Sequence, residues 1–271
     1  GTRIVGALRG RDAIYIWTDT SMFIMRFVGA PFVFSFQQVG TNCGLIGKNA
    51  AVEVDGTAYW MSENGFFKYT GKLDSLPCLV EDYVYDDINT VNKNHIYAGL
   101  NNLFGEVTWF YPGSGAASNN RSVTYNYMDS SAERPVWTTS SLARSTWSDS
   151  HIFGKPHATE YDSSSTSDST VGNTDGCTTY YEHETGNNQI KAGTATAIAA
   201  NIQSGDFDIG QSPIPNQGDG EMMMKIRRVL PDFLTQTGTT RVTLNLKNYP
   251  TDSEASSSLG PFDITSSTTK I

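Results

Sequence analysis

The sequence predicts an all-β fold made of β-propeller-like blades of antiparallel sheet, with one short helix and a C-terminal β region. The main observation is a near-repeat: residues 17–23 (Trp-Thr-Asp-Thr-Ser-Met-Phe) recur in altered form at residues 61–67 (Met-Ser-Glu-Asn-Gly-Phe-Phe). Each copy is an apolar strand, a polar turn and a returning strand. A spacing of about 44 residues is typical of one four-stranded blade. Weaker hairpins are predicted at residues 106–127 and 177–184.

The predicted elements begin with two hairpins. Residues 12–17 and 22–28 flank the turn at residues 19–21, Pro31 ends this unit, and residues 32–36 form another strand. Asp55-Gly56 is a strong two-residue hairpin signal before the strand at residues 59–61. The next tight turn is Asn64-Gly65, followed by a strand over residues 66–69.

One segment departs from the strand pattern. Val80, Tyr83, Val84, Ile88 and Val91 recur at helical spacing, with acidic residues in the first turn. This predicts an amphipathic helix of about three turns, with one face packed against the sheets.

The remaining chain returns to strands and loops. Hairpin strands are predicted at 95–100 and 103–111, another strand at 123–127, and longer strands at 222–229 and 241–246. Exposed loops are predicted at 113–120 and 163–176, and the tail at 252–271 is Ser/Thr-rich. A shift in composition near residues 205–220 divides the chain into propeller-like blades (1–204) and C-terminal strands (205–271), which complete the propeller or form a small β domain.

Composition limits the classes of function. The 271 residues carry a formal net charge of −9, the wrong sign for a surface that grips phosphate backbones. Cys43, Cys78 and Cys177 fit neither a metal-binding spacing nor a disulfide framework, and we interpret them as small thiols in a chain made in a reducing cytosol. No stretch is long and apolar enough to span a membrane, and no signal segment is recognised. The chain begins at Gly1 rather than Met, which indicates a fragment or a processed protein.

Several clusters were weighed as sites. Glu182-His183-Glu184 is the one compact acid–His–acid cluster, but consecutive strand residues point to opposite faces, so a solvated strand end is favoured over a catalytic or metal site. His151 and His157 lack a third metal donor. A calcium loop was also considered, without a regular ladder of ligands; its candidates are Asn173, Asp175, Asp206, Asp208 and Asp219.

The sequence does not favour an enzyme. The turn at residues 62–65 lacks the Ser-x-Asp-x-Gly-x-x-Trp spacing of sialidase propellers, and no nucleophile elbow or phosphate-binding loop is present. The acidic pairs Glu81-Asp82 and Asp86-Asp87 fall on the predicted helix as solvated charge. The aromatic runs at 109–111 and 180–181 suit a sugar platform or, more commonly, cross-strand packing. We therefore predict no catalytic, cofactor-binding or metal-binding residues and no cofactor.

Seven segments resemble the tail nozzle proteins of short-tailed bacteriophages, also called packaged-DNA stabilisation proteins. The first are residues 39–47 (Val-Gly-Thr-Asn-Cys-Gly-Leu-Ile-Gly), followed by 55–60 (Asp-Gly-Thr-Ala-Tyr-Trp) with Gly65-Phe66-Phe67. The later ones are 106–112 (Glu-Val-Thr-Trp-Phe-Tyr-Pro), 144–147 (Arg-Ser-Thr-Trp), 181–186 (Tyr-Glu-His-Glu-Thr-Gly) and 204–209 (Ser-Gly-Asp-Phe-Asp-Ile). The resemblance covers about residues 10–250.

The resemblance implies a structural virion protein, made in the host bacterial cytoplasm and located in the tail. It would form a homo-oligomeric ring, commonly a hexamer, beneath portal and adaptor proteins and near tail fibre or needle proteins. The ring would retain the packaged genome and pass it non-specifically during DNA ejection, and an acidic channel would let DNA slide. The alternatives are a carbohydrate-binding propeller that recognises a host glycan and a glycan hydrolase on the same scaffold.

Overall fold

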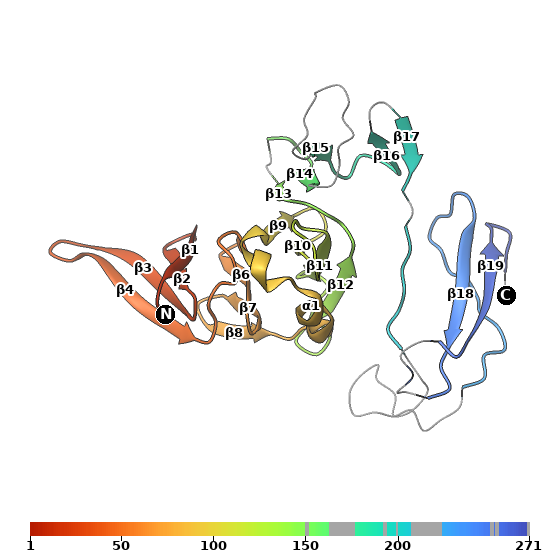
Figure 1. The fold of residues 1–271 in the computed structure, drawn as a ribbon, viewed down its shortest axis with the longest axis horizontal. Coiled ribbons are helices and arrows are strands. Elements are labelled where there is room, and N and C mark those ends of the chain that lie inside the picture. The colour runs from red at the N-terminus through yellow and green to blue at the C-terminus, as the bar shows by residue number, and fades with distance from the viewer. Residues whose placement is uncertain are drawn as a thin grey trace. The chain divides into compact units, whose positions relative to one another are not determined.

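A computed structural model describes residues 1–149, 152–162, 177–191, 194–198, 200–206, 224–249, 252 and 255–269. The chain divides into two units, Gly1–Asn187 and Asn188–Ile271. The division therefore falls ahead of the boundary expected at residue 204. The regular structure of the described residues is almost entirely strand, which confirms the all-β prediction (Figure 1).

The first unit is a series of antiparallel sheets in which neighbours in sequence are neighbours in the sheet. The first sheet contains β1 (Ile4–Arg9), β2 (Ile14–Thr18), β3 (Ser21–Gly29) and β4 (Val33–Thr41). The second contains β5 (Ala51–Val54), β6 (Thr57–Ser62), β7 (Gly65–Tyr69) and β8 (Leu73–Leu76). The third contains β9 (Tyr97–Asn101), β10 (Glu106–Tyr111), β11 (Arg121–Asn126) and β12 (Val136–Ser140). The fourth pairs β13 (Thr146–Ser148), β14 (His157–Asp162) and β15 (Cys177–Glu182).

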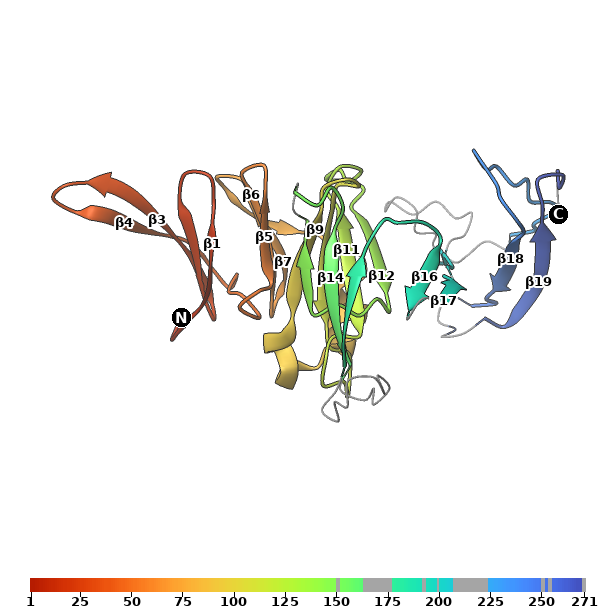
Figure 2. The same ribbon diagram turned by 90° about the horizontal axis from the view of Figure 1, so that it is seen from above.

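The first strands of consecutive sheets lie beside one another. β1 contacts β5, β5 contacts β9, and β9 contacts β13, and the first three sheets follow one another in Figure 2. The near-repeat occupies the same place in two sheets, the turn between β2 and β3 and the turn between β6 and β7. This explains the spacing seen in the sequence. The arrangement is the one that blades adopt, while closure into a propeller stays a prediction.

Aromatic side chains fill the space between the sheets. Trp17 lies 5.3 Å from Trp60, ring centroid to ring centroid, across the first and second sheets, and Phe66 lies 5.0 Å from Trp109 across the second and third. All four are fully buried. Large rings bury enough area for short strands to form a core, which offsets the modest hydrophobic content of the chain.

The predicted three-turn helix is wrong in its length. α1 spans Glu81–Asp87, and a 3₁₀ helix, η1, follows at Thr90–His95. Ile88 between them is extended and bridges to Gly113. The Asn89 side chain accepts a hydrogen bond from the Val91 amide and starts the new turn. The helical spacing of apolar residues therefore extends to Val91 in the sequence, although α1 ends at Asp87.

Three other predictions need correction. Residues 177–182 form one strand paired with β14 rather than a hairpin. The loop at residues 113–120 is not wholly exposed, because Asn119 is buried. Residues 224–229 form no strand, and the rest of the strand predicted at 222–229 lies outside the described residues, as does the loop at 163–176.

The second unit contains two hairpins in its described residues. β16 (Asn188–Lys191) pairs with β17 (Thr194–Ala197), and β18 (Thr240–Leu246) pairs with β19 (Ser257–Ile264). β18 confirms the strand predicted at 241–246. β19 places ordered sheet in the Ser/Thr-rich tail.

Candidate functional site: a pocket among the first strands

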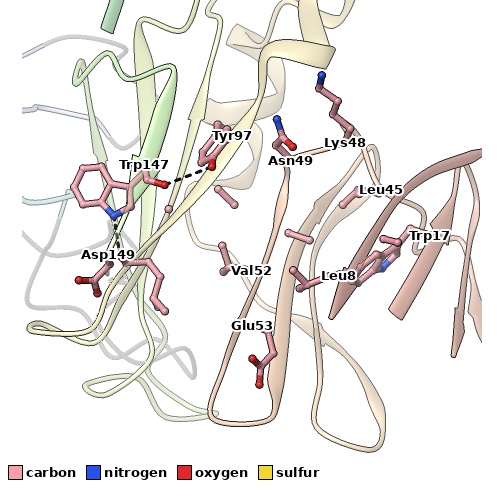
Figure 3. A pocket seen from close by; sticks show the side chains of 15 residues that line it. Leu8, Trp17, Leu45, Lys48, Asn49, Val52, Glu53, Tyr97, Trp147 and Asp149 are labelled. Atoms are coloured by element: carbon pink, nitrogen blue, oxygen red, sulfur yellow. Dashed lines mark hydrogen bonds between the residues drawn. The ribbon is translucent and has the colours of Figure 1, made fainter. Parts of the chain in front are cut away.

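A pocket of about 350 Å³ lies where the first strands of the four sheets meet (Figure 3). Its wall is contributed by β1, β5, β9 and β13, with further side chains from β2 and from the connection before β5. Its lining residues are Ala7, Leu8, Trp17, Leu45, Lys48, Asn49, Ala51, Val52, Glu53, Tyr97, Ala98, Gly99, Leu100, Trp147 and Asp149. Because the first strands form it, the pocket occupies the position of the central cavity in a propeller.

Backbone hydrogen bonds fix one side of the pocket. Asn49 forms a parallel bridge with Tyr97, and its carbonyl accepts a hydrogen bond of 2.8 Å from the Ala98 amide. Gly6 lets β1 approach this connection: a Cβ at Gly6 would lie 2.9 Å from the Lys48 carbonyl oxygen. The second and third sheets are thereby joined at their first strands.

Trp147 forms the opposite side. Its indole nitrogen donates a 2.8 Å hydrogen bond to the Leu100 carbonyl, and its own carbonyl accepts one from the Tyr97 hydroxyl at 3.4 Å (Figure 3). Gly99 makes room for the indole, since a Cβ there would lie 2.6 Å from Trp147 Cγ. The half-buried indole is therefore held in one orientation against β9.

The charged side chains of the pocket are of both signs. Lys48 is exposed, and Glu53 and Asp149 are half-buried. Asp149 is oriented because its Oδ2 accepts a 2.7 Å hydrogen bond from the Asn102 amide. Side chains of both charges beside an aromatic wall are better suited to hydrogen bonding with a neutral polar molecule than to binding an anion. No group of three potential metal ligands occurs among the residues that the structure describes.

A second feature of the first unit is an uncovered sheet face. In each of the first three sheets, three paired residues form a row across the first three strands, and the three rows occupy equivalent positions. The rows are Ala7, Ile16 and Phe23 in the first sheet, Ala51, Trp60 and Phe67 in the second, and Ala98, Trp109 and Val123 in the third. In the second and third sheets this row packs on the preceding sheet. In the first sheet the row points away from the second sheet. Trp17, the residue after Ile16, packs against the second sheet, and consecutive strand residues point to opposite faces. We call the side chains of Ala7, Ile14, Ile16, Phe23 and Met25 the outer face.

The cluster Glu182-His183-Glu184 was predicted to be a solvated strand end, which is correct for its two glutamates and wrong for His183. His183 is half-buried, with its ring centroid 4.6 Å from that of Trp147. Its Nε2 accepts a 3.0 Å hydrogen bond from Nε of the buried Arg144. Burial, followed by the charge of Arg144, lowers the pKa of His183 from 6.5 to about 4. The imidazole is therefore neutral at neutral pH, as an acceptor of an Arg hydrogen bond must be.

Arg144 holds this cluster together. Its guanidinium lies over the Tyr181 ring, with Cζ 3.9 Å from the centroid, and its Nη1 is 3.3 Å from Glu160 Oε2. Asn119 donates one hydrogen bond to the Arg144 carbonyl at 2.9 Å and another to the His95 carbonyl at 2.8 Å. The Nε, Nη1 and carbonyl groups of Arg144 all have partners within the fold, so we interpret the cluster as structural.

The other sequence candidates are dispersed or lie outside the described residues. His157 lies on β14 and contacts Tyr180, while His151 lies outside the described part. Of the calcium candidates only Asp206 is described, and it is paired with Lys247. Cys43 and Cys78 are free thiols.

The aromatic run at residues 109–111 is fully buried as predicted, but its ring contacts with Phe66 and Trp147 are made between sheets rather than between paired strands. Tyr180, by contrast, is 64% exposed. Sequence reasoning missed the pocket, because its lining comes in short segments of one to four residues from four repeats. Alignment of the strand starts at Ile4, Ala51, Tyr97 and Thr146, about 47 residues apart, is the signal that finds it.

No family model matches this chain, and no curated protein matches it.

Proposed function

We propose that this chain is a structural subunit of a phage tail that packs side by side with copies of itself in a ring-shaped nozzle, which conducts and retains the packaged genome. The observation that carries the proposal is the outer face of the first sheet. The same row is covered in the next two sheets, so this face is suited to receive another sheet. The identity of the assembly rests on the sequence resemblance to tail nozzle proteins.

A ring is the assembly that such a face favours. Sheets stack here in one direction, with the row containing Trp60 or Trp109 laid against the preceding sheet. A contact between two different faces repeats from copy to copy and closes into a ring when the rotation allows it. Large apolar contact area is also what separates stable interfaces from incidental ones.

The proposed role needs no catalytic turnover and no bound cofactor. Its partners are other copies, commonly six in a ring, portal and adaptor proteins above, and fibre or needle proteins. The protein would be made in the bacterial cytoplasm and reside in the virion tail. The net charge of −9 is compatible with a lumen along which DNA slides. No helix in the described part of the chain is long and apolar enough to cross a bilayer.

The test is the mass and symmetry of the purified protein, measured by light scattering and negative-stain imaging over a range of concentrations, alone and with its portal-side partner. We expect rings with an open centre. Ile16→Asp with Phe23→Asp should abolish them, and the control Leu103→Asp, at an exposed turn between β9 and β10, should not. A wild-type chain that stays monomeric under all these conditions contradicts the proposal.

A carbohydrate-binding role is the second candidate, because the pocket combines an oriented indole with carboxylate and amide groups. The Trp147 ring is stacked on Phe110, with centroids 5.5 Å apart, so a sugar would be held here by hydrogen bonds to the polar side chains. A soluble glycan screen tests it: binding that is lost in Asp149→Asn and retained in Leu103→Asp would favour this role over the nozzle.

A further inference from the structure

The first sheet carries a long hairpin that extends beyond its neighbours. β2 begins at Ile14, which pairs with Met25 of β3. Beyond this level β3 and β4 continue as a two-stranded arm, pairing Arg26 with Ser35 and Phe27 with Phe34. Figures 1 and 2 show the arm projecting from the rest of its sheet. We call residues 27–36 (Phe-Val-Gly-Ala-Pro-Phe-Val-Phe-Ser-Phe) the arm tip.

The arm tip is apolar and exposed. Phe27 is 73% exposed, Phe32 80% and Phe36 65%. The sequence has no charged residue between Arg26 and Lys48. Exposure of several large rings in one projecting segment is costly in water, and such a segment usually marks an interaction site.

Phe27, Phe34 and Phe36 share the face of the arm that also carries Met25, while the other face and the turn carry further apolar residues. Phe27 and Phe34 form an edge-to-face pair with centroids 5.9 Å apart on one face. Val28 follows Phe27 in the strand and points to the other face, and Phe32 lies in the turn. A flat protein surface would cover one face only, whereas the outer layer of a bilayer covers all of them.

The length of the tip suits shallow insertion. Gly29, at the turn, is three residues from Arg26, which corresponds to about 10 Å along a strand. Apolar elements at membrane surfaces penetrate about 5–10 Å into the boundary between headgroups and acyl chains. Arg26 would then lie at the depth of the phosphates, with which a guanidinium forms charge-assisted hydrogen bonds.

The charge at the base of the arm is balanced. Arg9 and Arg11 lie near the turn between β1 and β2, where Asp12 also lies, and they line a shallow hollow with Glu53 and Asp55. General attraction to anionic lipid is therefore weak. The tip would depend on its apolar side chains, with little dependence on lipid charge or salt.

We propose that the arm tip inserts into the outer layer of a phospholipid bilayer and attaches the protein peripherally to it. This proposal does not rest on ring formation. A monomer carries the whole arm, while a ring would strengthen attachment by presenting several arms at once.

Vesicle flotation with the full chain tests the proposal. We expect the protein to float with phosphatidylcholine vesicles and, to within about threefold, equally with vesicles containing phosphatidylglycerol. Phe32→Ser with Phe34→Ser should reduce binding at least tenfold. The matched control, Leu103→Ser with Phe104→Ser, removes two apolar side chains exposed at the turn between β9 and β10 and should leave binding unchanged. Wild-type protein that floats with neither vesicle overturns the proposal, as does equal loss in both variants.

Insertion depth gives a second, independent measurement. The variant Phe32→Trp places an indole at the turn, and we expect its emission to shift to the blue and to be quenched by brominated acyl chains. Emission that is unchanged by these lipids overturns insertion. A tip variant that loses self-association by light scattering while retaining vesicle binding would identify the occupant as a second copy and also overturn it. Failure of the ring leaves the vesicle result unaffected, so the two proposals can fail separately.

Discussion

The first sheet and the second sheet have the same topology and register but differ in what covers them. At one equivalent position the second sheet has Trp60, fully buried, and the first has Ile16, half-buried. The Trp60 indole contacts Trp17 and donates a 2.9 Å hydrogen bond to the Cys43 carbonyl. Trp109 of the third sheet donates likewise to the Ala50 carbonyl at 3.0 Å. Both carbonyls lie in the connection between β4 and β5, so the two indoles attach the second and third sheets to this connection.

The difference shows that stability in this chain is created between sheets. A four-stranded antiparallel sheet with one bare face is an incomplete unit, and each added sheet supplies the missing cover. In the first sheet, the outer face is the surface equivalent to the one that packs on the preceding sheet in the second and third sheets. It has no partner among the described residues. Substitutions at equivalent positions should therefore have unequal effects.

The largest expected effect is at Trp60. Trp60→Ala should lower the free energy of unfolding by about 3–5 kcal/mol, because it opens a cavity between two sheets and leaves the Cys43 carbonyl without its donor. The equivalent change, Ile16→Ala, should cost less than half as much in the unassembled chain. Urea denaturation of both variants measures the difference. Equal losses would show that the outer face is already covered.

Asn119→Ala should come next, with a loss of about 1–3 kcal/mol. Its amide links the backbone just before β9 to the backbone just before β13, and removing it leaves two carbonyls without a donor. Thermal unfolding followed by near-UV circular dichroism measures the loss. Ser118→Ala, in the same loop, is the control, and a similar decrease there would point to the loop as a whole rather than to the amide.

The pH dependence of stability should be the third effect. The pKa of His183 is lower in the folded chain than its ordinary value of 6.5, so the unfolded chain binds more protons between pH 6.5 and about 4. Stability contributed by the neutral ring is complete above pH 6.5 and decreases as the pH falls to about 4. Because the ring is only half-buried, we expect about 1–2 kcal/mol. His183→Gln should remove this part of the pH profile, and an unchanged profile would contradict the assignment.

The smallest effect is expected at Phe36, on the bare side of the comparison. Phe36 is 65% exposed and lies beside Met25 on the outer strand of the first sheet. Phe36→Ser should change the free energy of unfolding by no more than about 0.5 kcal/mol. A loss above 1 kcal/mol in the isolated chain, measured by urea denaturation, would mean that this ring is packed in solution.

Local patterns determined much of the secondary structure. Asp55-Gly56 forms the turn between β5 and β6 as predicted, with positive φ at both residues. The next turn lies one residue earlier than predicted, at Glu63-Asn64, and Gly65 begins β7 paired with Ser62. Apolar patterns located β2 and β3, and the turn signal at Asp55-Gly56 located β6. The predicted helix was too long, because the spacing of apolar residues does not show that the backbone at Ile88 is extended and pairs with Gly113.

The sequence by itself determined that this protein is all-β, built from repeated hairpins with aromatic residues inside, because turn chemistry and the two-residue period are local properties. Only the tertiary structure decided how the repeats meet. It gathered Lys48, Glu53, Tyr97 and Trp147 into one pocket and buried His183 beside Arg144. Among the described residues, it also left the outer face and the arm tip without cover. These outcomes depend on which face of each sheet meets the next, a long-range contact that no local pattern records.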